Sequence, residues 1–176
     1  MTLSFYDATI KPMKKAIKNL RKVLHIGAKH AQENGIEEET LLQKKLFEDM
    51  FDLRTQIFAV QLLSAHQGAL CIAGVTPSPT DVQFNTFAGA DALLETLLSD
   101  LDKIDPETYQ SKMLEPVTCN LPIGTAHFET ALEHMQQWVI PHTYFHVTTA
   151  YNILRHNGVP LGKSDYLGAV NMRLEK

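Results

Sequence analysis

The chain has 176 residues, a net charge of −4 and an isoelectric point near 6.0. This length suits a single domain over residues 1–176 with a substantial core, and it is too short to predict two domains. The mild acidity gives no general attraction to nucleic acid or to an anionic membrane, so we expect neither as a partner.

The N-terminal residues and the cysteines both bear on the cellular compartment of the protein. Residues 1–7 lack the basic region and apolar segment of a signal peptide, and we interpret the charge-free apolar stretches as shorter than a membrane span. The two cysteines, Cys71 and Cys119, lie far apart and outside any paired-cysteine motif. They predict neither a disulfide framework nor a sulfur-rich zinc site. We therefore expect a cytoplasmic protein with two buried, unreactive thiols.

An amphipathic pattern begins the chain. Apolar residues recur at steps of three and four from Tyr6 to Ala31, which predicts a long first helix that ends near Asn34 and Gly35. Basic residues fill its other side, namely Lys11, Lys14, Lys15, Lys18, Arg21 and Lys22. We interpret them as a solvated helix face in preference to a basic binding patch.

A second amphipathic helix is predicted from about Leu46 to Ala73. Its core-facing residues would be Phe47, Met50, Phe51, Phe58, Leu62, Ala65, Ala69 and Ile72. The glycine and prolines of residues 74–79 end this helix, because proline cannot continue a helix and disfavours helical geometry in the residue before it.

The third predicted helix has the most regular apolar stripe in the chain. The stripe consists of Phe87, Ala90, Leu94, Leu97, Leu101 and Ile104. A polar, proline-bearing stretch follows over residues 106–122, with a short extended segment predicted at 113–119. Thr125 is then predicted to cap a short helix that carries Leu132, Met135 and Val139.

Pro141 is predicted to begin the last helix, because the amide that proline lacks would have no partner at a first helical position. This helix ends near Asn157, since Gly158 supplies a C-terminal stop. The pattern predicts an all-α fold, an antiparallel four-helix bundle with a long crossover before the last helix. Such bundles build metal sites from side chains that face their interior.

Three histidines are the candidate site residues. His142 and His146 lie four residues apart, a spacing that stacks two imidazoles on one helix face so that a single ion could contact both. His66 lies within the apolar second helix, where a polar ring needs a partner. Together they predict a three-histidine site for a divalent metal, with zinc or nickel favoured and no organic cofactor indicated. Their nearest ring nitrogens should then converge to within about 3 to 4 Å of one another.

A second interpretation of the same residues needs no metal. His66 would be a core histidine bonded to a backbone carbonyl, and His142 and His146 would only form the start of the last helix. The protein would then be a non-catalytic bundle, a binding or stress-related module whose cavity is empty or holds an apolar ligand. Whether the chain is an enzyme stays open on the residues alone.

Two segments carry a resemblance to a known family. Residues 141–168, PHTYFHVTTAYNILRHNGVPLGKSDYLG, are similar to the C-terminal signature of an uncharacterised (domain-of-unknown-function) family of the DinB/YfiT-like metalloenzyme superfamily. Residues 46–56, LFEDMFDLRTQ, are similar to the opening of that family's second helix. The resemblance implies a four-helix bundle that holds a divalent metal through one histidine of the second helix and two of the last. Those positions fall on His66, His142 and His146.

The resemblance also implies an activity and an assembly. Some relatives transfer low-molecular-weight thiols or isomerise thiol adducts, which implies a metal-dependent thiol transferase or isomerase with a small-molecule ligand. DinB-like bundles tend to pair, and the first and third helices each offer a long apolar stripe. We therefore expect a homodimer that buries on the order of 1,600 Å² or more in total.

Overall fold

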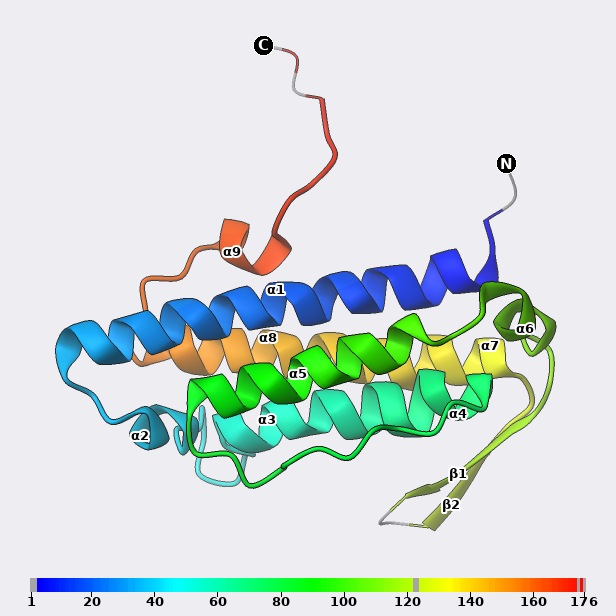
Figure 1. The fold of residues 1–176 in the computed structure, drawn as a ribbon, viewed down its shortest axis with the longest axis horizontal. Coiled ribbons are helices and arrows are strands. Elements are labelled where there is room, and N and C mark those ends of the chain that lie inside the picture. Colours follow the sequence, from blue (N-terminus) through cyan, green and yellow to red (C-terminus); the bar gives the residue numbers. More distant parts are fainter. Residues whose placement is uncertain (1–2, 122–123, 174, 176) are drawn as a thin grey trace.

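The computed structural model describes residues 3–121, 124–173 and 175. Most of them are helical, and long helical stretches lie lengthwise beside one another (Figure 1). The elements of these stretches are α1 (Phe5–Asn34), α3 (Leu53–Ala59), η1 (Val60–Ala69), α4 (Leu70–Ala73), α5 (Phe87–Asp102), α7 (Ala131–His134), η2 (Met135–Val139) and α8 (Ile140–His156). Three shorter helices join or flank them, α2 (Glu38–Leu42), α6 (Pro106–Ser111) and α9 (Lys163–Leu167).

The first helix is confirmed with its predicted end. α1 begins after Ser4, whose hydroxyl accepts a hydrogen bond from the Asp7 amide at 3.0 Å, and it ends at Gly35 with a left-handed φ of 63°. Its apolar stripe is buried against α5 and α8. The predicted stripe of α5 is buried as well, so both stripes are used within one chain.

The second long helix differs from the prediction at its start. α3 begins at Leu53, because the Asp52 carboxylate caps it by accepting a hydrogen bond from the Thr55 amide at 2.8 Å. Phe47 and Phe51 lie in the loop before it and are 69% and 56% exposed, so their predicted place in the core was wrong. The Asp52 cap determines where the helix begins, whereas the apolar periodicity extends into the residues before the cap.

Two stretches of π-helix, η1 and η2, interrupt the α-helical pattern. Their i→i+5 hydrogen bonding winds the chain through a smaller angle per residue than an α-helix does, which changes the face that later residues occupy. The two stretches contact each other, with Gly68 of η1 directly against Val139 of η2. A side chain at residue 68 would not fit there, so this glycine permits the close approach.

The connection that spans the length of the helices lies before α5 and not before the last helix, which corrects the predicted crossover. At one end of α5 the Phe87 amide donates to Glu38 at 2.6 Å, and at the other end the Ser78 amide donates to Asp100 at 2.8 Å. Residues 74–86 therefore return along the bundle, and α5 runs in the same direction as α3 and α4 (Figure 1). These residues can extend about 40 Å, which exceeds the roughly 24 Å length of α5.

The fold is mostly helical, as predicted, and it also contains a short β-hairpin. β1 (Val117–Leu121) pairs antiparallel with β2 (Gly124–Phe128), with Val117 opposite Phe128. The predicted extended segment overlaps β1 at residues 117–119. Thr125 lies within β2 and caps no helix. The cap of α7 is Thr130, whose hydroxyl accepts a hydrogen bond from the Glu133 amide at 3.1 Å.

The last helix is longer than predicted, because α7, η2 and α8 continue without a break through Pro141. Pro141 lies inside this continuous stretch, directly after the π-helical η2, and it cannot donate a backbone hydrogen bond to the preceding turn. Side chains bond the carbonyls at this junction. The Thr143 hydroxyl donates to the Val139 carbonyl at 2.8 Å.

One helical stretch, Leu53–Ala73, is long and apolar enough to cross a membrane by length and composition alone. This corrects the expectation that all charge-free stretches are shorter than a membrane span. In the fold, 61% of its most apolar window is buried inside the protein. A core helix has the same composition, and the burial favours that interpretation.

Candidate metal centre and its pocket

The histidine pair of the sequence analysis lies in the first turns of α8. The rings of His142 and His146 stack with centroids 5.9 Å apart and an angle of 24° between their planes. The four-residue spacing therefore places both imidazoles on one face, as predicted.

His146 is held by a residue that the sequence analysis did not select. Its Nδ1 lies 2.7 Å from the amide oxygen of Gln56 on α3, and both side chains are buried. Because that oxygen can only accept, Nδ1 carries the proton and Nε2 is left unprotonated. Burial, together with the nearby His142, lowers the pKa of His146 to about 4. The ring is therefore neutral at physiological pH.

His142 is oriented in the same way by the backbone. Its Nδ1 lies 2.8 Å from the Trp138 carbonyl oxygen, and its ring centroid is 4.2 Å from that of the Trp138 indole. The carbonyl again fixes the proton on Nδ1 when the ring is neutral. Both histidines thus present Nε2 as the free ring nitrogen, which is the tautomer of an Nε2 metal ligand whose other nitrogen is fixed by a hydrogen bond.

The pair borders a pocket of about 410 Å³ between the second and last long helices. Apart from Gln137 and the two imidazoles, its walls are apolar, formed by Phe51, Leu63, Pro141 and Phe145. The volume suits a small organic molecule. A ligand in this pocket would meet two imidazole rings within a hydrophobic surround.

His66 lies elsewhere. Gly68 of η1 faces Val139 of the last long helix, and His66 lies two residues before Gly68. Two residues correspond to about half a helical turn, so the side chain of His66 points to roughly the opposite side of η1. Its Nε2 is buried without a hydrogen-bond partner, and burial lowers its pKa while Asp100 of α5 opposes that shift. The carbonyl partner of the metal-free interpretation is therefore not found for this nitrogen.

The three rings do not converge. Within residues 3–121, 124–173 and 175, no group of three or more His, Cys, Asp or Glu side chains is arranged to hold a metal ion. The structure brings together His142 and His146, adds Gln56 beside them, and leaves His66 on another side of η1. Metal binding stays a prediction, and the residues that would bind the metal are His142 and His146.

Gln56 could have been suspected from its sequence context. It is a polar residue in the apolar stretch that follows Leu53, and buried amides in such places bond a specific partner. The tyrosines of α8 do not line the pocket beside the histidine pair. Tyr144 lines a separate pocket together with Tyr166, and Tyr151 packs edge-on against the Tyr166 ring.

Comparisons with known proteins agree on the family. Residues 5–167 match the family described as Domain of unknown function (DUF1993). A crystal structure of a DinB family member protein from Shewanella denitrificans shares 28% sequence identity and a TM-score of 0.81 with this chain, over 97% of this chain and 95% of that one. No curated protein matches. The chain therefore belongs to the DUF1993 family, an uncharacterised family of DinB-like proteins.

Proposed function

We propose that this DinB-like protein binds a divalent metal ion through Nε2 of His142 and Nε2 of His146, in a pocket for a small molecule. The observation that carries the proposal is the oxygen acceptor beside Nδ1 of each ring. Each Nδ1 is committed to an oxygen acceptor, Gln56 for His146 and the Trp138 carbonyl for His142. This leaves two unprotonated nitrogens beside one cavity.

The donor set fits a metal only in part. The two imidazoles suit zinc or nickel, whereas His66 does not join them. A metal held by two protein nitrogens keeps further coordination positions for water or substrate, and it would act there as a Lewis acid or bind a thiolate. The protein's own part is to orient the two rings through Gln56 and Trp138 and to surround the ligand with Phe51, Leu63 and Phe145.

Metal binding is tested with protein purified without a nickel column, freed of metal by a chelator, and titrated with zinc or nickel in a calorimeter. His142→Ala and His146→Ala should each abolish one-to-one binding. Gln56→Leu should weaken it roughly 10- to 100-fold, because it removes the acceptor that orients His146. His156→Ala, at the exposed end of the same helix, is the matched control and should bind like the unchanged protein.

His66→Ala distinguishes the two-histidine site from the three-histidine site. We expect it to change the metal affinity little, because the ring lies on another side of η1. A loss as large as that of His142→Ala would restore the three-histidine site. Absence of one-to-one binding by the unchanged protein, with helical circular dichroism intact, would contradict the proposal and favour a metal-free binding module.

We further propose that the bound molecule is a small thiol or thiol adduct and that the protein is a transferase or isomerase. The support is the apolar pocket beside donors that suit a thiolate-binding metal. The test incubates metal-loaded protein with a panel of low-molecular-weight thiols and a chromogenic electrophile. His146→Ala should lower the rate to background, and equal rates for the two proteins would exclude this chemistry from the site.

The competing function is a non-catalytic module that holds an apolar ligand in the same pocket. It is favoured by the absence of a third donor among the described side chains and by the phenylalanine-rich wall. Binding of an apolar fluorescent probe tests this function. Binding that Phe145→Asp abolishes and that added zinc leaves unchanged would support the non-catalytic module. Competition between zinc and the probe would instead place both at the histidines.

We also propose that the protein is a cytoplasmic homodimer, formed through a surface other than the stripes of α1 and α5. Those stripes are buried within the chain, whereas Phe47, Phe51 and Phe145 are exposed. We expect sedimentation at micromolar concentration to give a dimer, and Phe47→Asp to give a monomer. Leu114→Asp, at an equally exposed position, is the control and should leave the dimer intact. A monomer for the unchanged protein would contradict this proposal.

A further inference from the structure

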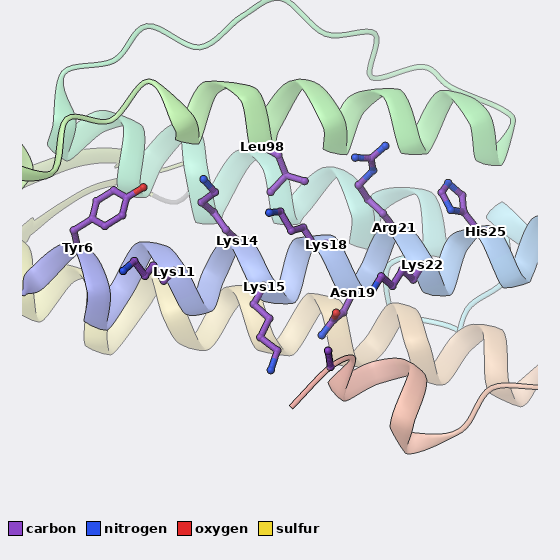
Figure 2. Close-up of a pocket in the computed structure, with 11 residues that line it drawn as sticks. Tyr6, Lys11, Lys14, Lys15, Lys18, Asn19, Arg21, Lys22, His25 and Leu98 are labelled. Carbon is purple, nitrogen blue, oxygen red and sulfur yellow. The ribbon is translucent and has the colours of Figure 1, made fainter. Parts of the chain in front are cut away.

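A second cavity lies away from the histidine pair, along the basic face of α1. It has a volume of about 880 Å³ and runs between α1 and α5 (Figure 2). Its lining includes the six basic residues that the sequence analysis assigned to a solvated face, together with Leu98 of α5 and Ala169 beyond α9. The lysines of α1 therefore line a concave surface, which the sequence pattern could not indicate.

Half of these basic residues are already neutralised. Arg21 forms a bidentate ion pair with Asp91 of α5 at 2.6 and 2.8 Å, and Lys14 forms an ion pair with Asp102 at the end of the same helix. Lys11 pairs with Asp7 within α1 at 2.5 Å. Arg21 and Lys14 thus fasten α1 to α5 and are not free to bind a ligand.

The other half is uncompensated. Lys15, Lys18 and Lys22 have no carboxylate within 4.0 Å in the part of the chain that the structure describes, although the protein is acidic overall. Their spacing of three and four residues places them within an arc of about 60° and along about 10 Å of the helix. Figure 2 shows Lys18 directed toward α5, Lys15 toward the side of α9, and Lys22 between them. Like charges at this spacing repel one another, and a bound anion would relieve the repulsion.

We propose that this groove binds a compact polyphosphate anion, such as the di- or triphosphate group of a small molecule, through Lys15, Lys18 and Lys22. Charge complementarity favours an anion, and the span of the three lysines suits several linked phosphates. The α5 side of the groove is lined by Leu98, whereas the α5 carboxylates of Asp91, Glu95 and Asp102 lie outside its lining, paired with Arg21 or Lys14. An extended polyanion or a membrane surface would face these carboxylates as well, whereas a compact ligand inside the groove meets mainly the lysines.

The test titrates sodium tripolyphosphate into the full-length protein in a calorimeter at about 25 mM and about 200 mM salt. We expect one-to-one binding that weakens with salt. The triple variant Lys15→Gln, Lys18→Gln, Lys22→Gln should bind roughly tenfold more weakly or worse at low salt, because it removes three charge-assisted contacts. The control variant Lys44→Gln, Lys45→Gln, Lys163→Gln changes the net charge equally at exposed positions outside the groove and should bind within about twofold of the unchanged protein.

Two results would overturn the proposal. Equal weakening in the two triple variants would mean a response to net charge without a site. Absence of tripolyphosphate binding, combined with lysine-dependent binding of single-stranded DNA or of anionic lipid vesicles, would assign the groove to a polymer or a membrane. Circular dichroism of both variants checks the fold, and Lys18→Gln alone should give an intermediate affinity if the fold of the triple variant is lost.

Discussion

Acidification from pH 6.5 to pH 4 is expected to destabilise the protein by several kcal/mol through two buried histidines. Burial lowers the pKa of His134 to about 4 and, together with His142, that of His146 to about 4. The unfolded chain takes up protons near pH 6.5 and the folded chain does not, so stability is highest above that pH and falls until the folded pKa is reached. Two such groups give a loss of about 2.7 kcal/mol per pH unit inside this window, against a typical total stability of about 5–15 kcal/mol.

Urea unfolding followed by circular dichroism at a series of pH values measures this slope. His134→Leu should lower the slope by about half, since the ring is fully buried and its Nδ1 has no hydrogen-bond partner. His156→Leu replaces an exposed histidine and should leave the slope unchanged. A slope that is undiminished in His134→Leu would show that other groups cause the acid sensitivity.

Gly68→Ala is expected to destabilise the fold by about 1–3 kcal/mol. A Cβ at this position would lie 2.7 Å from Cγ2 and 2.8 Å from Cγ1 of Val139, where the two π-helical stretches contact each other. A glycine-to-alanine change inside an ordinary helix would instead stabilise by about 0.5–1 kcal/mol. The sign of the measured change therefore reports on the close approach of η1 and η2.

Thermal and urea unfolding give the measurement, and Gly162→Ala is the control, because its nearest neighbour would be 3.7 Å away. The control should change stability by less than about 0.5 kcal/mol. Adding Val139→Ala to Gly68→Ala should recover part of the loss, since the two residues are in direct contact. A stabilising effect of Gly68→Ala would show that the two helices lie further apart than described.

The boundaries of α1 were determined by local sequence and could be predicted. Its buried stripe runs from Phe5 to Ala31, and Gly35 supplies the left-handed residue that ends the helix. The family resemblance was likewise contained in contiguous residues, 141–168 and 46–56. Such features depend only on residues that are close together in the chain. Apolar periodicity and capping residues therefore predict them from the sequence.

The candidate site shows where sequence alone was insufficient. The pairing of His142 and His146 follows from four-residue spacing on one helix, which is local. The third partner depends on how α3 and η1 lie against α8, and His66 was selected only from its place in an apolar helix and from the family resemblance. In the structure His66 lies in the π-helical stretch η1, and the residue beside His146 is Gln56 of α3.

The sequence by itself determined the helical character, the family, the apolar stripes and the stacked histidine pair, because each rests on spacing within one segment. Only the tertiary structure decided the direction of α5, the partner of His146 and the concave surface along the lysines of α1. These depend on contacts between residues far apart in the chain, such as Glu38 with Phe87 and Gln56 with His146. Their free energy comes from packing and hydrogen bonds between helices, which a pattern within one helix does not contain.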